Sequence, residues 1–282
     1  METQGLVRLL RLELECRHYA ASTVREYTRL AGLFLDDHPN GVDALTRENV
    51  AKWIGEGATQ SRRRWRWLSL RSLGKTLVQD GLIDVDPTTR ISMPQEVVVP
   101  QPIASDEDLD ALLATCSGST TADVRDRALL LVMASTGARR AEIAALTVSD
   151  VDLDIGTVLI RNGKGGRSRT AFLDTRSRRA AIHWICHAGI SGHDPLWRSQ
   201  RGNALNGDGI RQVLERRSRR AGIHVTSHQF RRRLAAKWLI NGGSEVGLRS
   251  AAGWTSGAMV ARYAALAAQQ IAKVEHARIF DS

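Results

Sequence analysis

The sequence predicts a mainly α-helical protein with one small antiparallel β-sheet, divided into two domains. Three observations support this prediction. Apolar residues recur at helical spacing over most of the chain, prolines gather after its first third, and apolar residues alternate in one short region. The 282 residues suffice for two domains with a core each. A hydrophobic fraction of 43% with 25% charged residues is typical of a folded, soluble globular protein.

Residues 1–90 are predicted to form an all-α N-terminal domain. Their apolar spacing predicts helices at Thr3–Arg17, Thr23–Leu35, Arg47–Glu56 and Gln60–Asp80, with Ser22-Thr23 and Thr46 as N-caps. The next stretch, residues 91–105, "ISMPQEVVVPQPIAS", contains three of the six prolines. Proline lacks an amide donor and disfavours helix at the preceding residue, so this stretch is predicted to be an extended linker.

Residues 106–282 are predicted to form a mainly α C-terminal domain. Ser105 precedes a helix with an acidic first turn, and Gly137 follows a long apolar helix as its expected C-cap. The helical period is interrupted around "NGKGGRS", where apolar residues alternate at Val158, Ile160, Ala171 and Leu173. Alternation on both sides of a glycine-rich turn predicts a hairpin of short strands.

Charge points to a polyanionic partner. The chain has 40 Lys and Arg against 30 Asp and Glu, a net charge of +10, and most of its cations are arginines. The planar guanidinium matches phosphate oxygens well, so nucleic acid is the simplest partner. No apolar run is long enough to cross a membrane, and no signal peptide is expected. Three separated cysteines predict neither a disulfide framework nor a zinc cluster, which favours the cytoplasm.

One basic cluster opens the fourth predicted helix, where Trp65 and Trp67 are interleaved with arginines. A solvated helix face with two core tryptophans would explain the pattern, but the overall charge favours phosphate contact. The predicted DNA contacts are Arg62, Arg63, Arg64 and Arg66.

Groups that could perform chemistry occur in five motifs of the second domain. These are "TGARRAEI" with Arg139, the hairpin "GKG" with Lys164, "HQFR" with His228 and Arg231, "GW" with Trp254, and Tyr263 nine residues later. Arg140 competes with Arg139. No acidic cluster with metal-ligand spacing and no phosphate-binding glycine loop accompanies them, so neither metal nor cofactor is expected.

Together these groups suit phosphoryl transfer. Two arginines can clamp the non-bridging oxygens of a phosphodiester and stabilise the charge that grows in the transition state, as a metal would. A lysine can protonate a leaving oxygen, a histidine can exchange a proton, and an indole N–H can donate a hydrogen bond. A tyrosine that attacks phosphorus conserves the bond energy in a phosphotyrosine ester, so rejoining needs no ATP.

The ordered motifs resemble the catalytic signature of the tyrosine recombinase (phage integrase) family. The resemblance implies catalytic roles for Arg139, Lys164, His228, Arg231 and Trp254, with Tyr263 as the nucleophile. Glu142 matches the first motif and is interpreted as structural. Two positions depart from the common pattern: Arg232 replaces a frequent histidine, and Trp254 takes the alternative to histidine, which leaves more proton transfer to His228 and Lys164.

The resemblance covers roughly the whole chain and implies a short two-domain recombinase. Residues 1–90 would be the SAM-like core-DNA-binding domain and residues 106–282 the catalytic domain. The expected partner is double-stranded DNA at a specific core site, bound by a protein that is monomeric in free solution and tetrameric in the synaptic complex. A directionality factor is a further possible partner. The segment Ile271–Phe280 resembles the tail that packs into a neighbouring protomer.

Several alternatives remain open. Tyr263 alone would more often be a core aromatic, as Tyr27 is expected to be. His183, Cys186 and His187 share a predicted helix, but a complete metal-ligand set is not evident, so ordinary helix surface and core are favoured. The activity could also be DNA relaxation of the type IB topoisomerase kind, or the protein could be a non-catalytic DNA-binding protein. An RNA-binding protein fits less well because no aromatic sheet platform is visible.

Overall fold

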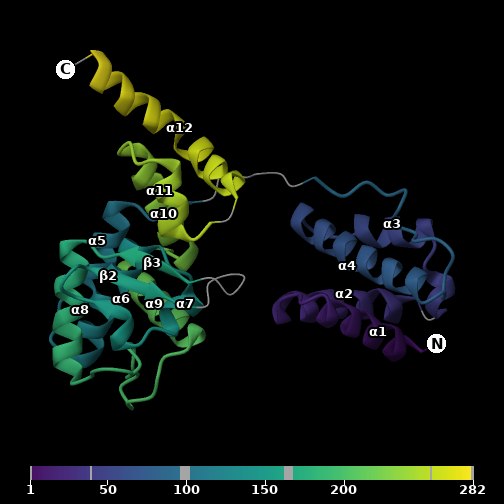
Figure 1. The fold of residues 1–282 in the computed structure, drawn as a ribbon, viewed down its shortest axis with the longest axis horizontal. Coiled ribbons are helices and arrows are strands. Elements are labelled where there is room, and N and C mark those ends of the chain that lie inside the picture. Colours follow the sequence, from purple (N-terminus) through teal and green to yellow (C-terminus); the bar gives the residue numbers. More distant parts are fainter. Residues whose placement is uncertain (1, 39, 96–101, 162–167, 255, 281–282) are drawn as a thin grey trace. The chain divides into compact units, whose positions relative to one another are not determined.

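The computed structural model describes residues 2–38, 40–95, 102–161, 168–254 and 256–280. The chain divides into two compact units, Met1–Val99 and Pro100–Ser282 (Figure 1). The predicted fold class is confirmed, since the elements are mostly helices with one three-stranded antiparallel sheet. Within the described ranges, every helix is too short or too polar to span a bilayer.

The first unit is a helical bundle around one hydrophobic core. Its helices are α1 (Thr3–Cys16), α2 (Ala21–Asp37), the 3₁₀-helix η1 (Gly41–Ala44), α3 (Arg47–Gly55) and α4 (Gln60–Gln79). Leucines at helical spacing, such as Leu6 and Leu10 in α1 and Leu70 and Leu73 in α4, are completely buried. The four predicted helices match α1 to α4 within two residues at each end.

The N-caps of this unit were predicted with mixed success. Thr46 caps α3 by accepting a hydrogen bond from the Asn49 backbone N–H over 3.2 Å. The cap at Ser22-Thr23 was wrong, because α2 begins at Ala21. The residue at the N-cap position is Ala20, which has no side-chain oxygen to accept a hydrogen bond from the first turn. The nearby Ser22 and Thr23 therefore indicated the wrong start for the helix.

The second unit packs helices around α6 and the sheet (Figure 1). Its elements, in order, are α5 (Asp106–Ala114), α6 (Thr121–Thr136), α7 (Arg140–Ala144), η2 (Val148–Asp150), β1 (Val151–Asp152), β2 (Thr157–Ile160), β3 (Arg169–Phe172), α8 (Thr175–Ala188), α9 (Gly207–Ala221), α10 (Ser227–Ile240), α11 (Glu245–Ala252) and α12 (Gly257–Phe280). Almost every residue of α6 from Val124 onward is buried, so this helix forms the centre of the unit.

The sheet has the strand order β1-β2-β3, and both pairings are antiparallel. Val158 pairs with Ala171 and Ile160 pairs with Arg169. Val158, Ile160 and Ala171 are buried as their alternation predicted. Because side chains alternate between the faces of a strand, Arg169 lies on the same face as Ala171, towards the core.

A second, smaller cluster of buried residues joins α10, α11 and α12. It contains Leu248, Trp254, Val260 and Tyr263 and is separate from the main core. In contrast, the last nine residues of α12, 272–280, are all exposed, including Ile279 and Phe280. The start of α12 is therefore held by the unit, and its end is presented to solvent.

Candidate active site

The loop after α6 places Arg139. Gly137 ends α6 in the left-handed conformation, with φ of +54°. A Cβ atom at this position would also lie 2.7 Å from Leu234 Cδ2 and 3.4 Å from the Arg231 Cα. Glycine is therefore required both for the backbone turn and for the close approach of α10. Two residues later Arg139 precedes the first turn of α7, with 31% of its side chain exposed.

Glu142 holds the start of α7 and lies between two arginines. Its carboxylate accepts from the Arg139 backbone N–H over 2.8 Å, from Arg139 Nη1 over 2.7 Å and from Arg169 Nη2 over 2.7 Å. Burial alone would raise the pKa of Glu142, but the hydrogen bonds and charges of Arg169 and Arg139 lower it to about 2. The carboxylate is therefore ionised at neutral pH, as a structural role requires.

Arg231 ties two segments of the site together from α10. It donates from Nη1 to the Gly137 carbonyl over 2.9 Å and from Nη2 to the Ala252 carbonyl over 2.5 Å. Only 5% of the residue is exposed. Burial, together with the positive charges of Arg139 and Arg169, lowers the pKa of Arg231 to about 10. It remains protonated at neutral pH, and because its partners are uncharged carbonyls its own charge is not neutralised by them.

Trp254 and Tyr263 are stacked on each other beside Arg231. Their ring centroids are 4.9 Å apart with an angle of 8° between the ring planes, and the Arg231 guanidinium carbon lies 5.3 Å from the indole centroid. Both residues are less than 10% exposed. The Trp254 Nε1–H is buried and has no hydrogen-bond partner among the described residues. An unpaired buried donor is costly, so this N–H is available to a ligand.

His228 lies in the first turn of α10, one turn before Arg231, and is exposed. Partial burial of the ring and the positive charges of Arg232, Arg231 and Arg139 lower the pKa of His228 below its ordinary value. The imidazole is thus neutral near pH 7 and able to accept a proton. Lys164 lies outside the described residues.

The structure brings together Arg139, Arg231, Trp254 and Tyr263 through direct or shared contacts. It adds Arg169 to this cluster, which sequence reasoning missed. The signal was present, because the alternation that placed Ala171 in the core also placed Arg169 on the inward face, where a charge needs a partner.

The arginines of α4 make several contacts within the first unit. Arg63 Nε donates to the Gly57 carbonyl over 2.9 Å, and the Arg66 guanidinium lies 4.2 Å from the Trp53 ring centroid and donates to the Trp53 carbonyl. Arg62 is the most exposed of the four, with 51% of its side chain accessible. Arg62 also forms an ion pair with Glu26 at 3.6 Å, and Arg63 and Arg66 stabilise the fold. Phosphate contact by these arginines stays a prediction.

The histidine pair on α8 lies beside Thr121. The rings of His183 and His187 are 6.3 Å apart, and His187 Nε2 lies 3.2 Å from the Thr121 hydroxyl. Over the described ranges, no three His, Cys, Asp or Glu side chains gather as metal ligands would.

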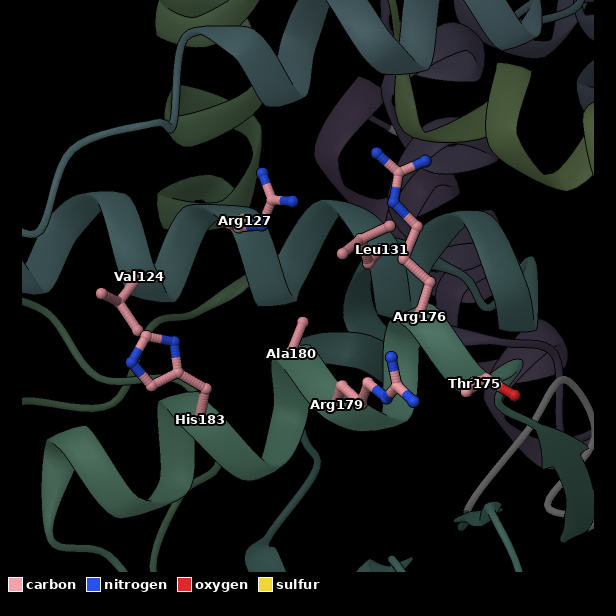
Figure 2. A pocket seen from close by; sticks show the side chains of 8 residues that line it. All are labelled: Val124, Arg127, Leu131, Thr175, Arg176, Arg179, Ala180 and His183. Carbon is pink, nitrogen blue, oxygen red and sulfur yellow. The ribbon is translucent and has the colours of Figure 1, made fainter.

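A separate cavity of about 450 Å³ lies between α6 and α8 (Figure 2). Three arginines, a histidine, a threonine and three aliphatic side chains line it. The lining residues are Val124, Arg127, Leu131, Thr175, Arg176, Arg179, Ala180 and His183. Arg176 is paired with Asp110 at 3.1 Å. Among the described residues, none of those predicted to be catalytic lines this cavity.

The second unit is thus a mainly helical domain with a three-stranded sheet, and two arginines, a tryptophan and a tyrosine cluster beside that sheet. Comparison with protein families identifies the class to which such a domain belongs. Residues 104–270 match the model of the phage integrase family, which is more than half of the chain. The chain belongs to this family.

Curated relatives are tyrosine recombinases. The chain is 31% identical to tyrosine recombinase XerC of Bacillus subtilis (strain 168) over 188 residues, which cover 63% of this chain and 61% of the relative. It is 29% identical to XerC of Mycobacterium tuberculosis (strain ATCC 25177 / H37Ra) over 202 residues, covering 68% and 66%. The alignments thus span less than two thirds of either relative.

Solved structures share the fold at low identity. A lambda integrase(75-356) dimer bound to a COC' core site superposes with a TM-score of 0.77 at 14% identity, covering 93% of this chain and 95% of that one. XerH bound to palindromic difH substrate gives a TM-score of 0.72 at 18% identity, with 90% and 79% covered. These likenesses establish the fold.

Proposed function

We propose that this protein is a site-specific DNA recombinase that cuts and rejoins strands through a covalent 3′-phosphotyrosine intermediate. The observation that carries the proposal is the cluster itself. Arg231 contacts both the loop that bears Arg139 and the segment that leads to Trp254, and Trp254 stacks on Tyr263. Four of the residues that the reaction would use, Arg139, Arg231, Trp254 and Tyr263, thus lie near one another although they come from four chain segments. Membership of the phage integrase family and the names of the curated relatives support the same function.

In the proposed reaction the Tyr263 oxygen attacks the scissile phosphorus and gives up its proton. The bond from phosphorus to the 5′ oxygen breaks, and Lys164 protonates that oxygen, so a free 5′-hydroxyl leaves. His228, neutral at pH 7, assists proton transfer at the nucleophile. A 5′-hydroxyl from a partner strand then attacks the phosphotyrosine, and the same steps run in reverse.

The charges of the site suit this transition state. Arg139 is partly exposed, so its guanidinium can reach the non-bridging oxygens from solvent, whereas Arg231 presents a buried cation from the interior. Charges held in place before the reaction lose no energy to reorganisation during it. The Trp254 N–H supplies a further donor, which a phosphate oxygen would satisfy.

The proposed substrate is double-stranded DNA at a specific core site, in the cytoplasm. A solved structure of XerH is bound to palindromic difH substrate, and one of a lambda integrase dimer is bound to a COC' core site. A tetramer at synapsis, a monomer in free solution and a directionality factor belong to the same proposal. The exposed end of α12 offers Ile279 and Phe280 to a neighbouring protomer. Replacing both by serine should reduce cooperative binding to paired sites and leave single-site affinity unchanged.

A trapping assay tests the function. The purified protein first selects a binding sequence from a random duplex pool, and a nicked version of that duplex is then incubated with wild type or Tyr263→Phe in EDTA. Denaturing gels should show a protein–DNA adduct for wild type only. An adduct with the Phe variant would mean that the nucleophile is another residue. Binding without any adduct would leave a non-catalytic DNA-binding protein, and relaxation of plasmid that lacks the site would favour the topoisomerase alternative.

A further inference from the structure

Arg169 is a buried cation that the proposed reaction does not use. It lies on the inward face of β3, paired with the buried Ile160, and 7% of its side chain is exposed. A charge in this position is costly unless it is paired and hydrogen-bonded, and an aliphatic residue would suit the sheet better. Its presence therefore needs a reason beyond the packing of the strand.

The contacts of Arg169 reach two catalytic segments at once. Nη2 donates to Glu142 Oε2 over 2.7 Å, at the base of the Arg139 loop. Nε donates to the Ala251 carbonyl over 3.2 Å, next to the Ala252 carbonyl that Arg231 binds. One guanidinium therefore links the sheet to both halves of the cluster.

Gly253 is shaped to this arginine. Its φ is +64°, and a Cβ atom there would lie 2.6 Å from Arg169 Cδ. The glycine that precedes Trp254 therefore lets the arginine stem pack directly against the backbone. A side chain at this position would displace Arg169 or move Trp254, so the two positions are mechanically coupled.

The electrostatic effect concerns Arg139. Glu142 carries one negative charge and is shared between Arg139 and Arg169 at equal distances of 2.7 Å. Without Arg169 the same carboxylate would be paired with Arg139 alone, and the pair would present no net charge to a phosphate. With Arg169 in place the group of three has a net charge of +1.

We infer that Arg169 is a positioning residue for strand cleavage, which rests on the function proposed above. It shares the negative charge of Glu142, so that Arg139 remains cationic towards the phosphate. It also packs against Gly253 and thereby holds the position of the adjacent Trp254. It does not touch the reacting atoms.

The test replaces Arg169 by methionine, which keeps the length of the stem and removes the charge. Cleavage of the selected nicked duplex should fall by about 10- to 100-fold, by analogy with the loss found when a residue that orients a metal ligand is replaced. DNA affinity should stay within about twofold. Arg198→Met is the matched control, because Arg198 also pairs with a carboxylate, Asp194 at 2.6 Å, and none of its described contacts is with a catalytic residue. It should cleave at the wild-type rate.

A double substitution tests whether Arg169 acts through Glu142. In the Arg169→Met background, Glu142→Gln removes the negative charge that is no longer shared, so part of the lost rate should return. A further loss equal to that of Glu142→Gln alone would show that the two residues act independently and would overturn the inference. Carboxyl NMR of ¹³C-labelled glutamates gives a readout without DNA, since Arg169→Met should raise the pKa of Glu142.

The outcomes separate the two proposals. If wild type forms no adduct, the proposed function fails. If wild type cleaves and folded Arg169→Met cleaves equally fast, the function stands and the positioning role is refuted. Should the methionine variant not fold, Arg169→Lys replaces it. Lysine keeps the charge but lacks the fork that reaches Glu142 and Ala251 together, so a cleavage rate at least about threefold slower is expected, and a wild-type rate would refute the role.

Discussion

Glu142→Gln should destabilise the second unit in a pH-dependent way. The pKa of Glu142 is lowered from 4.5 to about 2 by the hydrogen bonds and charges of Arg169 and Arg139, which outweigh the effect of burial. At about 1.4 kcal/mol per pKa unit, this difference corresponds to roughly 3 kcal/mol of stabilisation from the ionised carboxylate. Only 6% of the side chain is exposed, so solvent screens these interactions little. The glutamine keeps the shape and removes the charge.

The pH window follows from the direction of the change in pKa. Because the folded-state pKa is lower than the unfolded one, the stabilisation is fully present above about pH 4.5 and is lost as the pH falls towards 2. Wild type should therefore exceed Glu142→Gln by about 3 kcal/mol at pH 7 and by progressively less at pH 4 and pH 3. Near pH 2 the wild-type carboxylate is itself protonated, and the difference should approach zero.

Urea unfolding at pH 7, 5, 4 and 3, followed by circular dichroism, measures the difference in the free energy of unfolding. Glu215→Gln is the control, because Glu215 pairs with Arg211 at the same 2.7 Å but is 49% exposed. Its loss should stay under about 1 kcal/mol at every pH. A Glu142→Gln penalty that does not change between pH 7 and pH 3 would refute the reasoning, since the cost would then come from packing and not from charge.

Three further predictions concern single residues of the site. Gly137→Ala should lower the free energy of unfolding by about 2 to 4 kcal/mol, because the position combines a φ of +54° with a Cβ contact at 2.7 Å. Gly189→Ala is the control and should lower it by about 1 kcal/mol, because Gly189 has a φ of +59° but open space around its Cβ position. Equal losses would contradict the steric argument. Trp254→Phe should lower cleavage by about 10-fold or more, because it removes the buried N–H that a phosphate oxygen would bind, and normal cleavage would show that the reaction does not use this donor. The pKa of His228 is lowered, so cleavage that needs its neutral ring should persist below pH 6.5 and decrease only at lower pH. His228→Gln should abolish this decrease in rate at acidic pH. A decrease that remains in the variant must come from another group.

The fold could be predicted where local patterns and tertiary packing agree. Helical spacing marked α1 to α4 closely, and the alternation at Val158 and Ala171 marked two strands. The strand β1 has two residues, Val151 and Asp152, which is too short for any period to be detected. The start of α2 was missed because no side chain marks it.

Motifs could indicate which side chains meet in the cluster, but their catalytic roles stay predictions, and the backbone groups that hold them could not be predicted. Motif order indicated Arg139, Arg231, Trp254 and Tyr263, and Lys164 and the DNA contacts of α4 stay predictions. The carbonyls of Ala251 and Ala252, which accept from Arg169 and Arg231, have no residue-type signal because every residue has a carbonyl. Which carbonyls are left for side chains depends on where α11 ends, and helix ends are the least predictable part of a fold.

The charge balance of the cluster connects its stability to its function. Three arginines, Arg139, Arg169 and Arg231, surround one carboxylate, Glu142, and two of the three are less than 10% exposed. The group has a net charge of +2 in a poorly solvated place, which costs stability in the free protein. In the proposed reaction a phosphodiester would bring a charge of −1 to this position, and the transition state of its cleavage would bring more. The electrostatic free energy of this group of charges is thus less favourable in the free protein than with a bound phosphodiester, and it is most favourable in the transition state, where the negative charge is greatest. This is the difference in binding that catalysis requires, and packing alone would not produce it.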